Sequence, residues 1–75
     1  MKTALIQFVK AKRRALGLTQ RDLADRAGLG LRFIRDLEQG KESLRLDKVN
    51  QALALFGHRM KPAPFRPEEE DDEKS

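Results

Sequence analysis

Arginine and polar side chains gather in one stretch of the chain, "LTQRDLADRAGLGLRFIRDLEQGK", which covers residues 18–41. Near its end Arg32 and Arg35 stand three positions apart, a spacing that puts two side chains on one side of a helix. A guanidinium can donate two parallel hydrogen bonds to O6 and N7 of guanine, which discriminates against other bases by about 1–3 kcal/mol. These residue types therefore indicate recognition of base edges in DNA.

Catalytic chemistry has little support in the sequence. The chain has no cysteine, and its single histidine, His58, cannot form a metal site alone. It also lacks a glycine-rich phosphate loop and any sign of a pocket lined by acids. We therefore expect no enzyme activity, no metal or other cofactor and no small-molecule substrate. No apolar run approaches the roughly 20 residues that span a bilayer, and the first residues do not resemble a signal peptide, so we expect a cytoplasmic protein without a membrane partner.

The charge is distributed unevenly along the chain. Residues 68–75, "EEEDDEKS", contain six acids and one lysine, a charge of −5. Residues 1–67 contain fifteen Lys and Arg against six Asp and Glu, a charge of +9, although the net charge of the whole chain is only +4. So basic a body favours a polyanionic partner, with nucleic acid ahead of a membrane surface. The alternative is a basic surface that only keeps the protein in solution.

Apolar residues recur at helical spacing in four segments, each followed by a glycine. The segments are residues 3–16, 19–27, 31–39 and 46–56, and the glycines are Gly17, Gly28, Gly40 and Gly57. In the first segment Thr3 is a possible N-cap, and Leu5, Val9 and Leu16 are expected on the core side. This pattern predicts an all-α fold of four to five helices.

The second and third segments are separated only by the tight turn "GLG". Thr19 can cap the second helix, and Asp22 stands where a capping box places an acid. Ala24 allows the two helices to approach closely, and Ile34 and Leu37 are expected to hold the third helix from behind. Helix, sharp turn and helix is the arrangement in which one helix braces another in the DNA major groove.

The sequences "GLTQRDLADRAGL" and "FIRDLEQGK" resemble the XRE family of helix-turn-helix proteins, which includes phage repressors and Cro. The resemblance extends over about residues 5–57 and implies a repressor-like domain that binds double-stranded operator DNA as a homodimer. "RFIRDLEQGK" together with "LRLDKVNQALALFG" is most similar to HipB-type antitoxins. Those proteins bind a HipA-like Ser/Thr kinase toxin and repress their shared operon, so the resemblance implies such a toxin as a second partner.

The same resemblance implies roles for individual residues. The positions that match the base-reading face of the recognition helix are Leu31, Arg32, Arg35 and Asp36. Gln20 and Lys41 match positions that contact the DNA backbone, and Thr19 and Arg21 beside Gln20 are candidates for the same contact. The glutamine at the position of Gln20 can also pack on a side chain of the recognition helix. Arg13 and Glu38 match a pair that forms a salt bridge between the first and third helices.

Three positions depart from the family pattern, and two other residues have a second possible role. Gly30 replaces the usual Ser or Thr cap of the third helix, and Leu31 suits a thymine methyl but reads little by hydrogen bonding. Phosphate would repel Asp36 unless this acid accepts a hydrogen bond from a cytosine amine or orients Arg32 four positions before it. Arg13 could contact phosphate instead of forming an ion pair, and Phe33 could contact a base or partner instead of the core. Two other functions are also compatible with the sequence: an XRE-type regulator without a toxin, and a helical protein-interaction module that does not read DNA.

A chain this short buries only about 60% of its unfolded surface and has neither a disulfide nor a metal to support it, so we expect a dimer. Leu55 and Met60 are the candidate interface residues, and residues 58–63 could pair with their twofold mate as a short strand. We expect the helix-turn-helix domain to cover residues 1–61. Residues 62–75 should be a proline-containing, acidic, disordered tail that is solubilising, binds the toxin or competes with DNA for the basic face.

Overall fold

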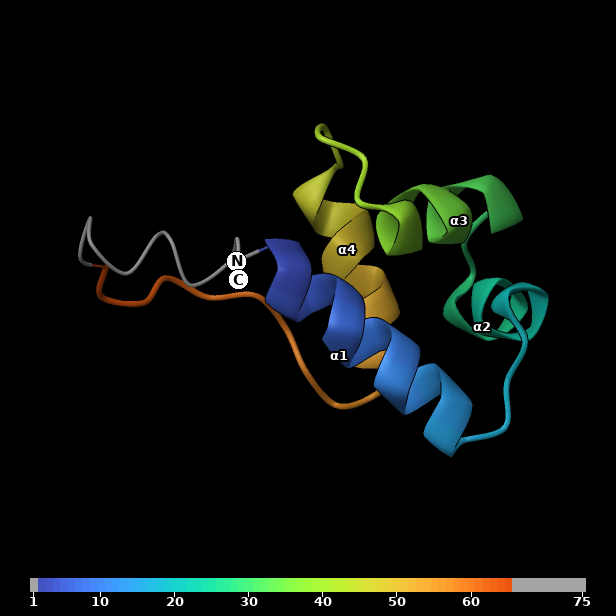
Figure 1. Cartoon of the computed structure of the whole chain (residues 1–75). Coiled ribbons are helices and arrows are strands. Elements are labelled where there is room, and N and C mark those ends of the chain that lie inside the picture. Colours follow the sequence, from blue (N-terminus) through green and yellow to red (C-terminus); the bar gives the residue numbers. More distant parts are fainter. Residues whose placement is uncertain (1, 66–75) are drawn as a thin grey trace.

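The structure is a computed structural model that describes residues 2–65. It contains α1 (Lys2–Ala15), α2 (Gln20–Ala27), α3 (Leu31–Gln39) and α4 (Leu46–Ala54). Residues 58–65 have no regular secondary structure, and we call them the C-terminal arm (Figure 1). The all-α prediction is confirmed, with four helices and no strand among the described residues. Of the expected acidic tail, residues 66–75 lie outside the described part of the chain.

The helix ends follow the glycines closely. All four predicted terminators have positive φ angles, from 69° at Gly17 to 82° at Gly40. At α2 the amide of Gly28 contacts the carbonyls of Ala24 and Asp25, which closes the helix. The N-cap prediction for Thr3 is wrong because α1 already begins at Lys2. The fourth helix ends at Ala54, two residues earlier than predicted, and continues as a turn.

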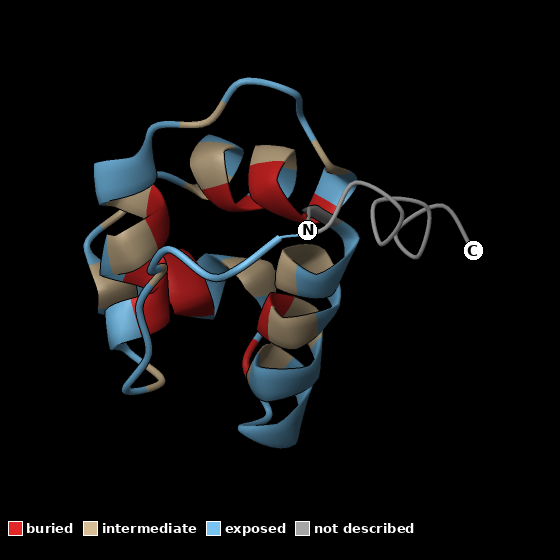
Figure 2. Cartoon of the chain, turned by 90° about the vertical axis from the view of Figure 1, so that its left-hand side faces the viewer, coloured by how far each residue is buried: buried red, intermediate tan, exposed pale blue. Residues whose placement is uncertain are grey.

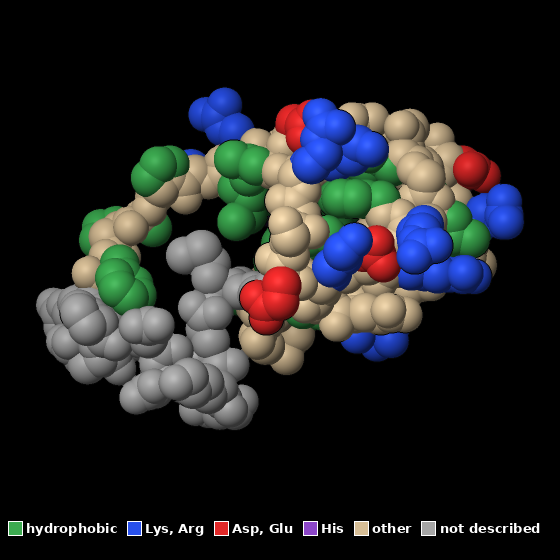
Figure 3. Space-filling model, turned by 90° about the horizontal axis from the view of Figure 1, so that it is seen from above, with side chains coloured by type: hydrophobic (Ala, Val, Ile, Leu, Met, Phe, Trp, Pro, Cys, Tyr) green, Lys and Arg blue, Asp and Glu red, His purple; other side chains and the backbone are tan. Residues whose placement is uncertain are grey.

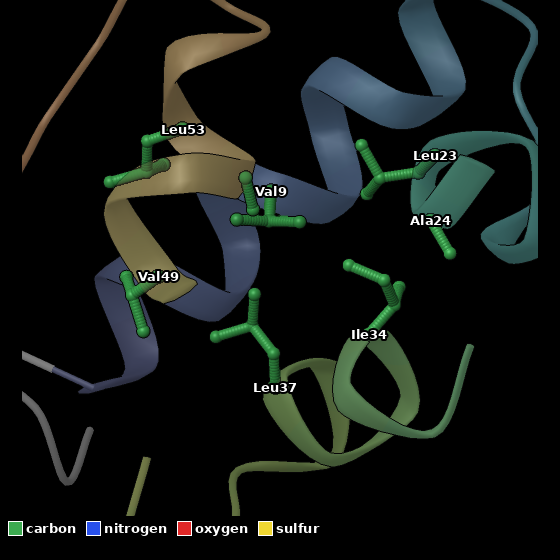
Figure 4. Packing of buried hydrophobic residues seen from close by; sticks show 8 residues of the cluster. Val9, Leu23, Ala24, Ile34, Leu37, Val49 and Leu53 are labelled. Atoms are coloured by element: carbon green, nitrogen blue, oxygen red, sulfur yellow. The ribbon is translucent and has the colours of Figure 1, made fainter. Parts of the chain in front are cut away.

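All four helices contribute to one core (Figures 2 and 4). Val9 of α1, Leu23 of α2, and Ile34 and Leu37 of α3 are fully buried. Figure 4 shows their side chains pointing toward a common centre, which α4 closes with Val49, Ala52 and Leu53. Because removing such a side chain leaves a cavity, Leu or Ile to Ala changes here would cost about 2–5 kcal/mol. The core therefore fixes how α3 lies against α2.

The expectation that Leu16 faces the core is wrong. Its side chain is 58% exposed, whereas Leu18 is buried with 7% exposed. The reason is that α1 ends at Ala15 and the chain reverses at Gly17, so the helical period no longer applies at Leu16. After the reversal the amide of Leu18 donates to the carbonyl of Arg13 at 2.9 Å, which turns the Leu18 side chain inward.

Gln51 of α4 holds the turn between α2 and α3. Its Nε2 donates to the carbonyl oxygens of Ala27 at 2.7 Å and Gly28 at 3.1 Å. These carbonyls lie at the C-terminal end of α2, where a helix has no N–H donors of its own to offer them. The contact ties α4 directly to the segment that sets the angle between the second and third helices.

Candidate nucleic-acid interface

The N-terminus of α2 is rigidly capped. Thr19 Oγ1 accepts a hydrogen bond from the amide of Asp22, and Asp22 Oδ2 accepts one from the amide of Thr19, both at 3.0 Å. Hydrogen bonds to the Asp22 carboxyl from the backbone and then the side chain of Thr19 lower its pKa below the ordinary value. The predicted capping box is thus present, and it fixes the backbone that carries Gln20 and Arg21.

The third helix has two chemically different sides. Ile34 and Leu37 are fully buried. Phe33 packs against the core, so its surroundings agree with a core role and not with contact to a base or partner. On the other side Arg32 and Arg35 are exposed. The N-cap Gly30 makes no side-chain hydrogen bond, so α3 is held by its packing rather than by its cap.

Two adjacent hollows bring the predicted DNA-contacting residues together. One, of about 480 Å³, is lined by Arg13, Thr19, Gln20, Arg21, Leu31 and Arg35. The other, of about 270 Å³, is lined by Leu31, Arg32, Arg35, Asp36 and Gln39. Leu31 and Arg35 belong to both, so the backbone-contacting and base-reading candidates form one continuous surface, which we call the recognition surface. Gln39 was not among the candidates, although it stands four positions after Arg35 on the same side of the helix.

A three-residue network joins the recognition surface to the rest of the fold. Arg13 Nε and Nη2 donate to Glu38 Oε2 at 2.8 Å and Oε1 at 3.0 Å, and Gln20 Nε2 donates to the same Oε1 at 3.1 Å. Burial by itself would raise the pKa of Glu38, but the hydrogen bonds from Arg13 and Gln20 and the nearby positive charges bring it below its ordinary value. The hydrogen bond to Glu38 in turn raises the pKa of Arg13.

Because Glu38 already holds the amide nitrogen of Gln20, the Gln20 side chain is oriented before any DNA arrives. Arg13 also donates to the carbonyl of Leu18 at 3.0 Å, so its guanidinium is largely engaged within the fold. The structure thus forms the ion pair that the sequence suggested for Arg13, although the residue also borders the recognition surface.

Lys and Arg side chains cover more of the face that carries α3 than Asp and Glu side chains do (Figure 3). Figure 3 looks down on this face and shows Lys and Arg side chains spread over it with single acidic side chains between them. Among the described residues there is no group of three His, Asp or Glu side chains that could hold a metal ion. No helix in residues 2–65 is long and apolar enough to cross a membrane.

Comparison with known proteins agrees with this geometry. The profile of the helix-turn-helix family matches residues 9–57, which include all of α2, α3 and α4. The chain belongs to the XRE-type helix-turn-helix family. The chain is also 47% identical over 50 residues to the uncharacterized HTH-type transcriptional regulator y4mF of Sinorhizobium fredii, a match that covers 67% of this chain and 66% of that protein. It thus spans about two thirds of the length of this relative, and no solved structure matches it.

Within this helix-turn-helix domain, Lys41 lies beside the recognition surface and pairs with one of its members. Lys41 Nζ is 3.5 Å from Asp36 Oδ2, and the Lys41 side chain remains 57% exposed. The lysine therefore compensates the charge of the acid that departs from the family pattern. A base-reading candidate and a backbone-contacting candidate are coupled in this way.

The two candidate dimer residues of the helix-turn-helix domain lie in different surroundings. Met60 is half-buried, packs against the core and lines an apolar groove between α1 and the C-terminal arm. Leu55 follows α4 directly, is 37% exposed and does not line that groove. The structure therefore does not place the two residues in one hollow.

Proposed function

We propose that this protein is a sequence-specific DNA-binding regulator that represses transcription in the cytoplasm. The observation that carries the proposal is the position of Arg32 and Arg35, exposed on α3 directly opposite the buried Ile34 and Leu37. Seated in a major groove, α3 would present both guanidinium groups to base edges while the core holds the helix from behind. No catalytic residue and no cofactor is needed for this activity.

The rest of the recognition surface divides between positioning and reading. Thr19, Gln20 and Arg21 at the start of α2 are suited to phosphate oxygens, which fix orientation but carry no sequence information. Leu31 can pack against a thymine methyl next to the bases read by the arginines. Asp36 can accept from a cytosine amine, and Lys41 lowers the cost of bringing this acid close to phosphate.

We further propose that the protein acts as a homodimer. Two recognition helices related by a twofold axis would read half-sites about one helical turn, roughly 10 bp, or a multiple of it apart. The size of the chain supports the proposal, because so small a core benefits from a second copy.

The finer proposal is that the protein is the antitoxin of a HipBA-like operon. The similarity of residues 32–41 and 44–57 to HipB-type antitoxins supports it, and a HipA-like kinase would then be the second protein partner. Co-purification with the kinase encoded beside the gene, together with loss of kinase activity in the complex, tests this point. If no such kinase binds, the protein is a stand-alone regulator.

The decisive experiment is binding to the DNA just upstream of the gene, with scrambled DNA of equal length, at two salt concentrations. We expect the wild-type protein to prefer the operator at the higher salt, and Arg32→Ala and Arg35→Ala each to lose about 1–3 kcal/mol of that preference. Arg26→Ala is the matched control, because Arg26 is in the last turn of α2 and lines neither hollow. Equal, salt-sensitive binding to both DNAs would contradict sequence reading and favour an interaction module.

A further inference from the structure

An apolar groove lies between the first turns of α1, the end of α4 and the C-terminal arm. Figure 1 shows that the start of α1 and the arm lie at the end of the molecule away from α2. The main part of the groove, a space of about 300 Å³, is bounded by the first turns of α1, the end of α4 and the start of the C-terminal arm, and it is lined by Ala4, Leu5, Phe8, Leu53, His58, Arg59 and Met60. A second part of about 240 Å³ shares Leu5 and Met60 and continues to Leu46, whose side chain is 60% exposed. We call both parts together the apolar groove.

The walls of the apolar groove are fixed by contacts within the fold. The ring centroids of Phe8 and His58 are 4.6 Å apart. The ring centroids of Phe8 and Phe56 are 6.3 Å apart, and these two rings meet edge-on. The amide of Met60 donates to Asn50 Oδ1 at 2.7 Å, which holds the beginning of the arm on α4. The groove is therefore already formed in a single copy of the chain, and a side chain that enters it meets little ordering cost.

Beyond Met60 the arm leaves the body of the protein. Residues 61–65 are exposed, and Phe65 at their end is 60% exposed. Figure 3 shows this part of the arm standing away from the body with hydrophobic side chains along it. Pro62 and Pro64 fix their own φ angles and keep the preceding residues extended, so Phe65 lies about 12 Å beyond Lys61 in a polyproline-like geometry. The arm thus carries its aromatic residue away from its own groove.

We propose that Phe65 of each copy fills the apolar groove of a second copy, so that the dimer is closed by a reciprocal exchange of arms. The proposal rests on the dimeric part of the proposed function and specifies the contact. A twofold axis uses the same pair of surfaces twice, as an isologous interface requires. Because Pro62 has no amide hydrogen, it favours docking by side chains over the paired strand expected for residues 58–63.

Area and charge support the same occupant. Because Phe65 is 60% exposed, two phenylalanines bury about a further 180–300 Å² and cover a similar area of the two grooves, and the prolines and Leu46 extend the contact toward the roughly 1,200 Å² at which stable interfaces begin. The charge of −5 on residues 68–75 follows the arm in sequence, and the body of residues 1–67 carries +9. An arm that docks on a second copy is followed in sequence by this acidic charge, which offsets the repulsion between two basic bodies.

The first test measures the oligomeric state of the full chain by sedimentation over a range of concentrations without DNA. Each phenylalanine buried in the dimer is worth about tenfold in affinity, so Phe65→Ala should raise the dimer dissociation constant about hundredfold. Leu16→Ala is the control, because Leu16 is equally exposed at 58% but lies at the other end of α1. A chain that is monomeric throughout, or a Phe65→Ala dimer as tight as wild type, overturns the proposal.

The second test identifies which copy the arm enters. The natural chain has no cysteine, so Ala4→Cys and Ala63→Cys proteins, which both keep Phe65, can be mixed and oxidised without background. We expect a disulfide that joins the two different variants, and none when Leu16→Cys replaces Ala4→Cys. A chain that carries both cysteines and forms the disulfide within one monomer would show that the arm enters its own groove, which overturns the exchange. Operator preference is measured separately, so a monomer that still prefers the operator would leave the proposed DNA reading intact.

Discussion

Arg13 and Glu38 form a two-bonded ion pair that connects the end of α1 to the end of α3, across 25 positions of sequence. The Glu38 side chain is only 2% exposed, and its Oε1 also accepts from Gln20 at the start of α2. One carboxylate therefore links three helices, including the recognition helix and the helix that braces it. The stability of the fold and the placement of α3 depend on the same contact.

Removing the arginine from this pair should destabilise the protein strongly. Arg13→Ala leaves the Glu38 carboxylate buried with only Gln20 as a partner, and we expect a loss of about 3 kcal/mol in the free energy of unfolding. Arg14→Ala is the matched control: Arg14 is the neighbouring arginine and is exposed, so its change should stay within about 0.5 kcal/mol. Urea unfolding followed by circular dichroism measures both values. Equal losses in the two variants would mean that the ion pair contributes nothing specific.

The same pair should make stability depend on pH in the acid range. The folded pKa of Glu38 is lowered relative to the unfolded chain, where it is about 4.3, so the ionised form stabilises the fold. That contribution is complete above the unfolded pKa and is lost as the pH falls through the folded pKa. We expect the stability difference between wild type and Glu38→Gln to be largest near neutral pH and to shrink below about pH 4.

The control for this titration is Asp25→Asn, because Asp25 is an exposed acid of the neighbouring helix. The change in the free energy of unfolding that Asp25→Asn causes should stay within about 0.5 kcal/mol. A constant difference between wild type and Glu38→Gln from neutral to acid pH would show that the charge of Glu38 does not stabilise the fold.

The turn between α2 and α3 should be sensitive to any side chain at Gly28. This residue has φ +72°, and a Cβ there would lie 3.2 Å from Gln51 Nε2. Gly28→Ala should therefore lower the free energy of unfolding by roughly 1–2 kcal/mol, because an L-residue is strained in the left-handed conformation. Displacing the Gln51 side chain should lower it further. Gly17→Ala has a similar φ of +69° and nothing within 4 Å, so it should cost only the first amount.

A double-mutant cycle separates the two contributions at Gly28. In a Gln51→Ala background the contact is gone, and Gly28→Ala should then cost no more than Gly17→Ala. Thermal unfolding of the four proteins of the cycle gives the coupling. If Gly28→Ala lowers the stability equally with and without Gln51, the Gln51 side chain moves away from the new Cβ at no cost in free energy.

Lys41 should affect DNA affinity without affecting sequence preference. Its ammonium is exposed beside the recognition surface, so Lys41→Ala should weaken binding to operator and scrambled DNA alike and reduce the log-log salt slope by about 0.9. Asp36 then loses its counter-charge, and adding Asp36→Asn to Lys41→Ala should recover part of the affinity. Fluorescence anisotropy at several salt concentrations measures both effects. A change of operator preference in Lys41→Ala would assign the lysine to base reading.

Local signals in the sequence determined most of the helical structure. The capping pair Thr19 and Asp22 and the four glycines set the helix ends because these effects act within a few residues. The apolar period placed Val9, Ile34 and Leu37 in the core for the same reason. Where the period was extended past a helix end, as at Leu16, the prediction failed.

The tertiary structure decided what depends on distant segments meeting. The sequence could suggest the pairing of Arg13 with Glu38 only through a family resemblance, and it did not reveal that Gln20 shares the carboxylate. Nor could it show that Gln51 holds the α2–α3 turn, or that α1 and α4 leave an apolar groove beside Met60. Such contacts join residues many positions apart, so their geometry is fixed by how the helices pack and not by any local pattern.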